Sequence, residues 1–424
     1  MGFLMNKEIL EFKNSNIAWI GQIPKHWEIK KLKYVLNERK ENNKPIKTDF
    51  ILSLTNEKGV IPYSEKGAQG NISKDDLSGY KIAYPNDIVL NSMNVVIGSV
   101  GLSKYYGAIS PVYYALYEKQ GSNIKFYNYI FQTSVFQNSL KGLGNGILEI
   151  RMRIPMSNLN NVYLPVPPFA EQERIAGFLD DKCASIDSSI ENLEQKTKSL
   201  AEYKKALITQ CVTKGLNPKI LEFKDSGIPW IRQIPKHWEI IRLGYICNKL
   251  NRKIDENDEP LICSNKGQVA FRDKNACGKM LSENHTMQGI QVGDIAIHGM
   301  DTWHGAIAYS NLKGKITGVV HVCDSKENNK FIVYFLQYLA IQGVYKLISN
   351  GVRGNTSDFR SWNSVKNIYI IVPPLNEQKE IAEFLDKKCE KIDNLSANYK
   401  EQIKTLKEYK KALIYECVTG KKQI

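Results

Sequence analysis

The sequence has no long hydrophobic run: no segment reaches the roughly 18 consecutive apolar residues of a membrane-spanning helix. The N-terminal stretch MGFLMNKEILEF lacks an apolar core followed by small residues, so it does not resemble a secretion signal. Asn6 stands where an N-myristoylation motif requires serine or threonine. We therefore expect a cytoplasmic protein that does not contact a membrane, and its 424 residues are enough for two domains with sizeable cores.

The sequence is also poor in patterns that bind metals. Its eight cysteines include no C-x-x-C pair, so they predict reduced thiols rather than a zinc site. Its six histidines include no H-E-x-x-H motif. Four of them lie in the second half without equivalents in the first, which favours structural or DNA-contacting roles over metal ligation: His285, His298, His304 and His321. We predict no metal site.

Motifs for catalysis and nucleotide binding are missing as well. An amino-methyltransferase needs a motif of the type N-P-P-[YF], in which asparagine accepts hydrogen bonds from the target amine. The chain has VPPF at 166–169 and VPPL at 372–375, where valine cannot accept, so both predict the start of a helix. GLGNG at 142–146 lacks a dinucleotide-binding context, and no G-x-x-x-x-G-K-[ST] loop occurs. We predict that this chain is not an enzyme and binds no cofactor.

Acidic residues are too few to balance the basic ones. The chain has 58 lysines and arginines against 44 aspartates and glutamates, which gives a formal net charge of +14. Such an excess favours polyanionic partners, and nucleic acid before the others. The alternative is a basic soluble protein without such a partner, which charge alone does not exclude.

What the sequence does contain is one architecture written twice. Residues 162–213 align without a gap with residues 368–419, and both copies carry P-P, E-Q, I-A, F-L-D and E-Y-K-K-A-L-I. A second repeat, EFKNSNIAWIGQIPKHWEIKKL at 11–32, returns as EFKDSGIPWIRQIPKHWEIIRL in the second half. The intervening segments differ far more, although NDIVLNSMNVVIGSVG at 86–101 aligns with GDIAIHGMDTWHGAIA at 293–308. The pattern predicts two domains of one fold with different surfaces.

Each copy of the longer repeat predicts a helix of roughly 45 residues, or about 65 Å. Apolar side chains recur every seven residues, with partners four residues on, as in a coiled coil. Lysine, threonine and serine occur among the partners in the two copies, so neither helix alone would make a strong zipper. We expect the helices to pair antiparallel within the chain; the alternative is dimerisation with a second chain. The predicted seam comprises Leu179, Cys183, Ile186, Ile190, Leu193, Leu200, Leu207, Leu385, Cys389, Ile392, Tyr399, Ile403, Leu406 and Leu413.

The doubled P-P-x-x-E-Q-x-x-I-A-x-F-L-D motif, together with W-I-x-Q-I-P-K-H-W, resembles the specificity (S) subunit of type I restriction-modification systems. The match covers nearly the whole chain. The resemblance implies two target recognition domains separated by long helices, and a bipartite double-stranded DNA site with an unread spacer. It also implies two methyltransferase (modification) subunits docked on the helical part, and restriction subunits that complete an endonuclease. S-adenosylmethionine and ATP would bind to those partners rather than to this chain.

We accordingly predict an α/β fold with pseudo-twofold symmetry, in which two similar recognition domains are separated by an antiparallel helical pair. The expected boundaries are 1–166 for the first recognition domain, 167–215 for the first long helix, 216–372 for the second recognition domain and 373–424 for the second long helix. A rod of fixed length would hold the domains apart, as dimeric DNA-binding proteins hold two half-sites. The alternative is a coiled-coil scaffold whose two heads bind proteins.

Base edges are contacted by polar side chains on projecting loops, so the candidates are polar residues that differ between the halves. The glycine-bearing stretches GLGNGILEIRMR at 142–153 and NGVRGNTSDFR at 350–360 would also let backbone approach phosphate. The candidates in the first domain are Lys58, Lys66, Asn91, Asn94, Asn145, Arg151 and Arg153. The candidates in the second domain are Lys266, Arg272, Lys274, His298, Asp301, Trp303, His304, Arg353, Asn355 and Arg360.

Overall fold

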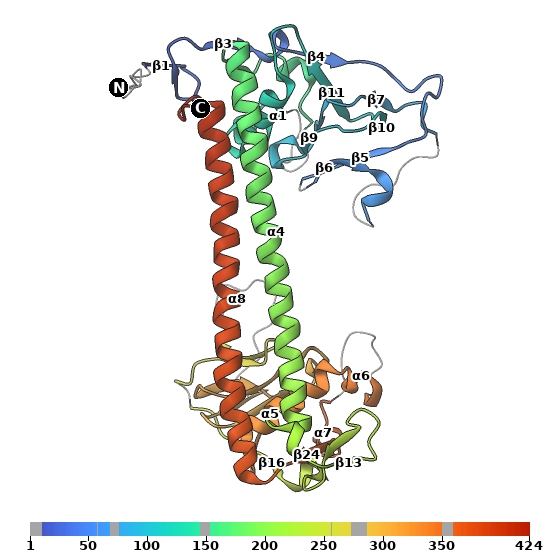
Figure 1. Ribbon diagram of the computed structural model, residues 1–424, viewed down its shortest axis with the longest axis vertical. Coiled ribbons are helices and arrows are strands. Elements are labelled where there is room, and N and C mark those ends of the chain that lie inside the picture. The colour runs from blue at the N-terminus through green and yellow to red at the C-terminus, as the bar shows by residue number, and fades with distance from the viewer. Residues whose placement is uncertain are drawn as a thin grey trace. The chain divides into compact units, whose positions relative to one another are not determined.

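The computed structural model describes residues 11–56, 58–67, 76–144, 153–255, 257–272, 286–349 and 359–424. The chain divides into two compact units. The first unit is Met1–Leu193 with Glu401–Ile424, and the second unit is Glu194–Lys400. Each unit contains one globular domain and parts of both long helices, α4 (Phe169–Lys214) and α8 (Leu375–Val418), which are labelled in Figure 1.

An antiparallel sheet forms the centre of the globular domain in the first unit. Its strand order is β4 (Leu36–Arg39), β11 (Tyr113–Glu118), β8 (Ile88–Asn91), β9 (Val100–Leu102). Two-stranded antiparallel pairs accompany it: β1 (Phe12–Asn14) with β2 (Gln22–Pro24), β3 (Glu28–Lys31) with β12 (Tyr163–Val166), β5 (Leu52–Thr55) with β6 (Gly59–Pro62), and β7 (Lys81–Ala83) with β10 (Gly107–Ile109). The short helices are α1 (Ile124–Gln132), α2 (Ser134–Ser139) and α3 (Met156–Leu159), with 3-10 turns η1 (Leu32–Tyr34), η2 (Tyr63–Glu65) and η3 (Val95–Ile97).

The globular domain of the second unit repeats this topology. Its central sheet has the order β16 (Cys247–Lys249), β23 (Val320–Ser325), β20 (Ile295–His298), β21 (Ile307–Tyr309). The accompanying pairs are β13 (Phe223–Asp225) with β14 (Gln233–Pro235), β15 (Glu239–Arg242) with β24 (Tyr369–Val372), β17 (Leu261–Ser264) with β18 (Gln268–Phe271), and β19 (Met287–Ile290) with β22 (Gly314–Thr317). The short helices are α5 (Asn329–Ile341), α6 (Val344–Ile348) and α7 (Trp362–Lys366), with 3-10 turns η4 (Pro218–Ile220), η5 (Leu243–Tyr245) and η7 (Thr302–His304).

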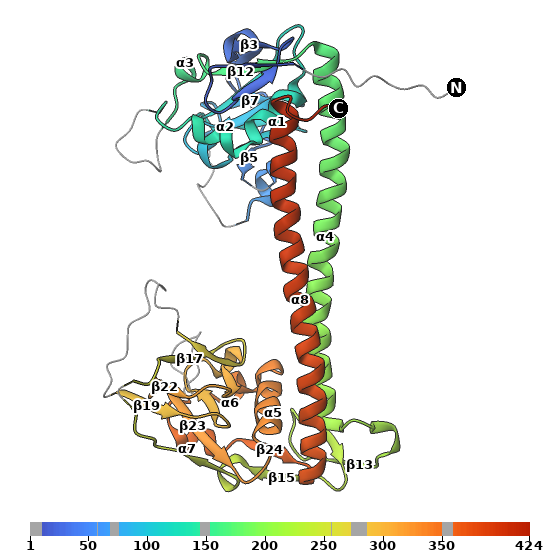
Figure 2. The ribbon, with the colours of Figure 1, turned by 90° about the vertical axis from the view of Figure 1, so that its left-hand side faces the viewer.

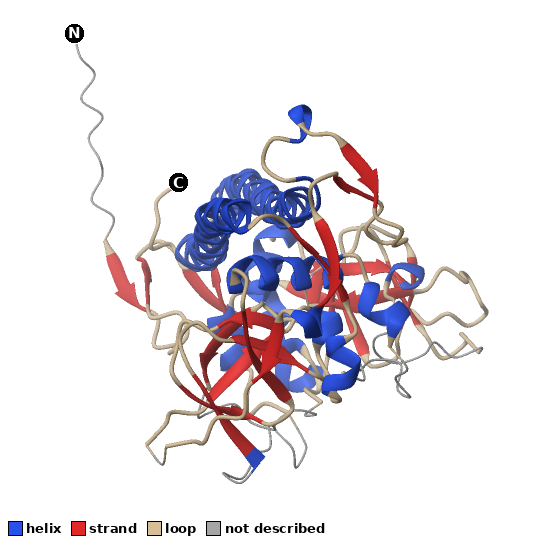
Figure 3. Cartoon of the chain, turned by 90° about the horizontal axis from the view of Figure 1, so that it is seen from below, coloured by secondary structure: helices blue, strands red, loops and turns tan. Residues whose placement is uncertain are grey.

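The two domains are thus mixed α/β domains of one topology, as the duplicated sequence predicts. In both, a series of strands comes first, three short helices follow, and one last strand leads into the long helix; Figure 3 shows the chain by secondary structure. The aromatic segments that follow the sheets form helices for a local reason. The Asn123 side chain caps α1 by accepting from the amide of Phe126, and Asn328 caps α5 in the same way with Phe331. The prediction of two similar α/β domains is confirmed.

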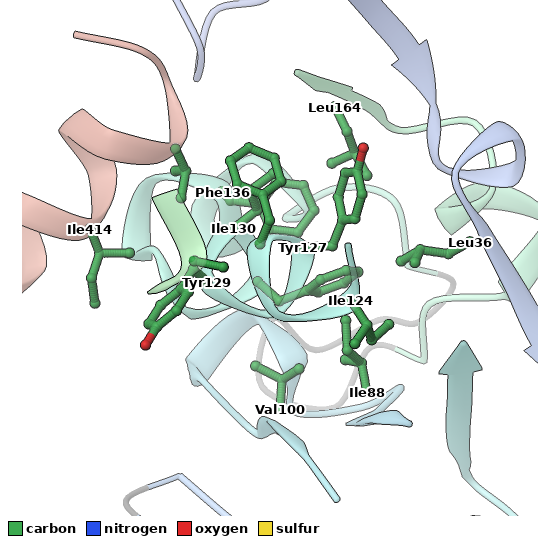
Figure 4. Close-up of a cluster of buried hydrophobic side chains, with 14 of the residues drawn as sticks. Leu36, Ile88, Val100, Ile124, Tyr127, Tyr129, Ile130, Phe136, Leu164 and Ile414 are labelled. Atoms are coloured by element: carbon green, nitrogen blue, oxygen red, sulfur yellow. The ribbon is translucent and has the colours of Figure 1, made fainter. Parts of the chain in front are cut away.

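Both faces of each central sheet are buried, because neighbouring residues of a strand point to opposite sides. On β8, Ile88 and Leu90 join the larger hydrophobic cluster of the first unit, whereas Val89 joins a smaller one that includes the β5–β6 hairpin. Figure 4 shows the larger cluster, where Ile130 of α1 and Ile414 of α8 contribute to the same core. The long helices are therefore part of the core of the globular domain and not an appendage to it.

The long helices run antiparallel in each unit (Figure 2). In the first unit, Lys410 of α8 donates a hydrogen bond to Asp187 of α4 (2.6 Å), while the earlier Cys183 lies near the later Cys417. An increasing residue number on α4 is thus paired with a decreasing one on α8. The second unit repeats the pattern with Lys204–Asp393 (2.7 Å) and Cys211–Cys389. The prediction of an intramolecular antiparallel pair is confirmed.

The predicted seam residues differ in burial. Eight of them are buried: Leu179, Cys183, Ile186, Ile190, Leu385, Cys389, Ile392 and Leu413. The other six are half-buried: Leu193, Leu200, Leu207, Tyr399, Ile403 and Leu406. No helix in the described ranges, long or short, combines the length and hydrophobicity needed to cross a bilayer.

Candidate nucleic-acid interface

The glutamate of the repeated E-Q pair joins the long helix to the W-I-x-Q-I-P-K-H-W motif. Glu171, in the first turn of α4, accepts hydrogen bonds from His26 Nε2 (2.8 Å) and Trp27 Nε1 (2.8 Å). The helix dipole favours a carboxylate at this end. His26 therefore orients a packed turn. The second unit has the same contacts between Glu377 and His237 (2.7 Å) and Trp238 (3.0 Å).

The glutamine of the E-Q pair joins the long helix to the first short helix of the domain. Gln172 is fully buried; its Nε2 donates to the carbonyl of Pro167 (2.9 Å), and its Oε1 accepts from the amide of Asn123 (2.8 Å). Since Asn123 is the residue that caps α1, this contact fixes the start of α1 against α4. In the second unit Gln378 makes the equivalent contacts with Pro373 (2.8 Å) and Asn328 (3.0 Å).

The aspartate of F-L-D makes a third junction. Asp180 accepts from Lys125 Nζ (2.7 Å) and from the Tyr129 hydroxyl (2.7 Å), both on α1. Burial, and then the bond to this carboxylate, raise the pKa of Tyr129, so the hydroxyl stays a donor. Asp386 repeats the arrangement with Lys330 (2.6 Å) and Tyr334 (2.8 Å). The repeated motif is thus structural: it holds each globular domain in a fixed orientation on a long helix.

The most variable candidate residues lie on one turn that both domains share. In the first unit it joins β8 to β9 (residues 91–99), and in the second it joins β20 to β21 (residues 298–306). We call these the β8–β9 turn and the β20–β21 turn. Each closes around a 3-10 segment that ends in a glycine with left-handed backbone, Gly98 (φ 95°) and Gly305 (φ 80°). That conformation favours glycine, which explains why this position coincides while its neighbours differ.

The remaining candidates of the first domain are spread over separate loops. Lys58 is exposed in the tight turn between β5 and β6, Lys66 follows η2 with its ammonium over the Tyr63 ring (5.1 Å), and Arg153 is exposed before α3. The first residue of the β8–β9 turn is Asn91, and Asn94 precedes η3. Asn145, Arg151, Lys274, Arg353 and Asn355 lie outside the described residues.

The second domain brings several candidates together. Arg272, His298, Asp301 and His304 line one groove of about 450 Å³, which β17 and the β20–β21 turn border. Lys266 lies near His304 on a second groove of about 410 Å³, which the long helix also borders with Lys204 and Lys205. Arg360 is exposed before α7 and lines neither groove.

Trp303 lines the second groove but is largely committed to packing. Its indole Nε1 donates to the carbonyl of Tyr345 in α6 (3.1 Å), and the Lys346 ammonium lies over its ring (5.7 Å). These contacts hold η7 against α6. The structure therefore gives Trp303 a supporting role for the turn, in addition to any contact that its exposed edge makes.

Asp87 and Asp294, which directly precede β8 and β20, each pair with an arginine that the repeats did not indicate. Arg39 Nε and Nη2 donate to Asp87 (2.7 and 2.9 Å), whose carboxylate is buried, and these bonds raise the pKa of Arg39. Arg252 and Asp294 form the same pair in the second unit (2.8 and 3.3 Å). The signal was present in the sequence as NERK at 37–40 and LNRK at 250–253, because an arginine accompanies both aspartates.

Neither thiols nor metal ligands form a reactive site in the described part of the chain. The described cysteines are free and buried, and burial raises the pKa of Cys211 to about 11 and of Cys247 to about 12. They are therefore protonated core residues at neutral pH. Within the described ranges no group of three or more His, Cys, Asp or Glu side chains could hold a metal ion.

Comparison with known proteins agrees with this arrangement. The chain is 24% identical over 441 residues to the putative type I restriction enzyme MjaX specificity subunit of Methanocaldococcus jannaschii, and the alignment covers 95% of each chain. It is 24% identical over 461 residues to the MjaIX specificity subunit of the same organism, covering 98% of this chain and 97% of the other.

Two solved structures share the fold. The HsdS subunit from Thermoanaerobacter tengcongensis superposes with a TM-score of 0.54 at 15% identity, covering 94% of this chain and 98% of that one. A chain from a structural study of complex assembly and conformational transition in a type I R-M system gives a TM-score of 0.61 at 16% identity, covering 93% and 98%. The model of the type I restriction modification DNA specificity domain matches residues 24–200 and again residues 235–405. Since these two matches cover most of the chain, the chain belongs to the type I restriction-modification DNA specificity family.

Proposed function

We propose that this chain recognises a two-part DNA target on behalf of a type I restriction-modification complex in the cytoplasm. Each globular domain contacts one short block of base pairs, and the base pairs between the blocks are not contacted specifically. The long helices set the gap and carry two methyltransferase subunits, which restriction subunits join. S-adenosylmethionine and ATP bind to those partners, and this chain supplies recognition without catalysis.

The observation that carries the proposal is the turn after β8 and β20. The two turns share a backbone but, at residues 91–99 and 298–306, they share only the methionines Met93 and Met300 and the glycines Gly98 and Gly305. A constant frame with different side chains suits two DNA blocks of different sequence, because base contacts specify whereas the frame positions. A shared ligand in both domains would instead favour shared side chains.

Charge and groove chemistry support the assignment of DNA as the ligand. The chain carries a formal net charge of +14, and the grooves of the second domain contain arginine, lysine and histidine side chains. Such side chains contact phosphates and the acceptor atoms of bases. We propose the loop candidates of both domains as DNA contacts, with Arg272, His298, Asp301 and His304 as the group of the second domain.

Partner docking is supported by what related proteins do. The structure that superposes with a TM-score of 0.61 comes from a study of assembly in a type I system. The repeated junctions at Glu171 and Glu377 offer two copies of one surface, which two identical methyltransferase subunits would require. We therefore place one methyltransferase subunit on the helical part of each unit.

The direct test is the methylation target in cells. The chain is co-expressed with the methyltransferase subunits of its own system, and the methylated positions are mapped by sequencing. We expect two short defined blocks around a gap of constant length. Replacing residues 44–160 with the same segment of another specificity subunit should change one block only. A single continuous block would contradict the proposal.

The helices provide a second test. Deleting one heptad from each helix removes about 10 Å of helix and should shorten the preferred gap while both blocks stay the same. A matched control deletes no residue and replaces the exposed residues of one heptad in each helix by alanine. Loss of methylation in the control as well would trace the defect to docking of the methyltransferase subunits, whereas an unchanged gap in the deletion would contradict the fixed-length role.

Salt separates DNA recognition from the alternative of a scaffold with protein-binding heads. Contacts with several phosphates release counterions, so the affinity for DNA should fall steeply with salt concentration. The affinity of a protein for a hydrophobic interface would change little. Titration of fluorescent DNA with the methyltransferase complex at rising salt measures this difference, and a flat response would favour the scaffold.

A further inference from the structure

The β8–β9 turn and the β20–β21 turn have the same hydrogen bonds. In the first unit, the amide of Asn94 donates to the carbonyl of Asn91 (3.1 Å), and the amide of Asn91 donates to the carbonyl of Ser99 (3.0 Å). In the second unit, the amide of Asp301 donates to the carbonyl of His298 (3.2 Å), and the amide of His298 donates to the carbonyl of Ala306 (2.9 Å). The side chains at equivalent positions are therefore compared on one backbone.

The first side chain of each turn uses its acceptor atom to hold the turn. Asn91 Oδ1 accepts from the amide of Met93 (3.0 Å). His298 Nδ1 accepts from the amides of Met300 (3.4 Å) and Asp301 (3.2 Å). Asparagine and histidine are chemically different, yet both accept from the amide of the methionine two residues on, and His298 accepts from the next amide as well. The part of each side chain that remains for a ligand is then fixed.

The remaining part is a hydrogen-bond donor in both units. With Oδ1 facing the backbone, Asn91 presents its Nδ2 amide hydrogens. With Nδ1 accepting, neutral His298 carries its proton on Nε2. Burial lowers the pKa of His298 and outweighs the Asp301 carboxylate, which raises it, so the neutral form is the one present at neutral pH. The His298 side chain is 18% exposed and lines the 450 Å³ groove.

The fourth position of the turn differs in a chemically decisive way. Asn94 can donate or accept, whereas the Asp301 carboxylate can only accept. Asp301 is 47% exposed on its side chain and lines the same groove as His298, with Oδ2 at 3.4 Å from His298 Nδ1. The second turn thus presents one donor beside one acceptor, at the edge of a groove that also holds Arg272 and His304.

We propose that Asn91 and His298 are equivalent specificity-determining residues, each donating to a purine in its DNA block, and that Asp301 makes the purine of the second block an adenine. In the major groove adenine offers an acceptor (N7) next to a donor (N6), which complements a donor beside an acceptor. Guanine offers two acceptors (N7 and O6), one of which would meet the carboxylate. The inference rests on the proposed function and names the atoms that carry out the recognition.

The sharpest test exchanges only the exposed atom. Both asparagine and aspartate can accept the backbone amides through Oδ1, so His298→Asn keeps the donor, and His298→Asp replaces it with a carboxylate oxygen. The full chain is co-expressed with the methyltransferase subunits, and methylation is measured on a plasmid library randomised in one block at a time. His298→Asp should reduce methylation of the preferred second block by about 10- to 100-fold while the first block is unchanged. His298→Asn should retain the preference for the same base.

The first unit supplies an independent pair of variants, which keeps the inference testable if one turn does not tolerate aspartate. Asn91→Asp should reduce methylation of the preferred first block, and Asn91→His should preserve its purine. Asp301→Asn should widen the second block to accept guanine as well as adenine. Circular dichroism and thermal melting of each purified complex show whether the variant is folded.

The outcomes separate this inference from the proposed function. A wild-type complex that methylates no two-block target contradicts the proposed function itself. A wild-type complex with two blocks, combined with folded His298→Asp and Asn91→Asp variants that keep every base preference within about twofold, overturns the inference alone. An equal loss in His298→Asn and His298→Asp also overturns it, because asparagine keeps a donor at the exposed end whereas aspartate places a carboxylate there.

Discussion

The two units share the side-chain hydrogen bonds of their junctions but only the backbone hydrogen bonds of their turns. At the junctions, Glu171 and Glu377 bond the same histidine and tryptophan of the W-I-x-Q-I-P-K-H-W motif with nearly the same distances. At the turns the backbone bonds agree while the side chains differ, as Asn91 and His298 show. A junction joins two elements and needs a matching donor and acceptor on both, whereas a side chain that bonds only the backbone of its own turn can be replaced by another with an acceptor in reach. A recognition protein can therefore alter its specificity without altering its core.

The largest effect that tests this equivalence is expected at the buried tryptophans. Trp27→Ala and Trp238→Ala each remove a side chain that is at most 2% exposed and leave a half-buried glutamate oxygen without its donor. Each should lower the free energy of unfolding of its own unit by about 3–5 kcal/mol, measured by hydrogen exchange on peptides of each unit. Tyr34→Ala and Tyr245→Ala, at 60% and 74% exposure, are the controls. If only one of the two tryptophan variants lost stability, the two junctions would not be equivalent.

The next effect is expected at the glutamines. Gln172→Leu leaves the amide of Asn123 and the carbonyl of Pro167 unpaired in a buried place, and Gln378→Leu does the same in the second unit. We expect a loss of about 1–3 kcal/mol for each, measured by urea denaturation of the purified complex. Gln22→Leu, at an exposed position of β2, should change stability little. Equal stability of the variant and the parent would show that water satisfies the two groups.

A smaller effect should distinguish the two arginine–aspartate pairs. Arg39 lies over the rings of Tyr84 (4.3 Å) and Tyr117 (4.8 Å) in addition to its bonds with Asp87. Within the described residues, the structure shows the bonds of Arg252 with Asp294 but no cation–ring contact of Arg252. Arg39→Lys should therefore cost about 1 kcal/mol more than Arg252→Lys, because lysine loses both the planar fork and the stacking. Thermal melts of the two variants measure the difference. Equal losses of stability would mean that stacking on Tyr84 and Tyr117 contributes nothing.

The smallest expected effect is a difference between the two units in the stability that each loses as the pH falls. Burial lowers the pKa of His298 and His321 in the second unit, whereas the sequence gives the first unit only His26, which is exposed. A histidine whose folded pKa lies below its unfolded value of about 6.5 resists protonation when folded, so its contribution is present above that pH and is lost as the pH falls below it. The second unit should lose more stability than the first between about pH 7.5 and about pH 5.5.

Hydrogen exchange with correction for the intrinsic rate measures this difference. His304→Asn, at an exposed position, should leave the difference unchanged. His321→Asn should reduce it, because His321 is buried against the carbonyl of Phe359 and the ring of Trp362. An equal loss in both units would mean that carboxylates and not these histidines determine the response to acid.

Much of the fold could be predicted because the sequence is repeated. A repeat of 52 residues with E-Q and F-L-D in both copies predicted two long helices, and a heptad of leucine and isoleucine predicted that they pair. The helix start after Pro167-Pro168 followed from the restricted backbone before and at proline. The arginine partners of Asp87 and Asp294 were missed, because a pair separated by about 45 residues leaves no periodic signal.

The candidate site was less accessible to prediction. Sequence comparison of the halves selected the variable polar residues, and Arg272, His298, Asp301 and His304 do line one groove. It could not indicate that Trp303 is engaged with α6 or that Lys204, on the long helix, lies beside the second groove. Those facts depend on which surfaces meet when α5, α6 and the long helices pack together.

The sequence by itself determined the duplication, the two long helices and the excess of positive charge, because these follow from repetition, periodicity and composition. Only the tertiary structure decided what the repeated polar residues do and which atom of Asn91 or His298 bonds the backbone of its turn. A side chain's hydrogen-bonding role depends on the backbone amides that surround it in space, and those amides belong to a turn whose shape is set by the sheet beneath it.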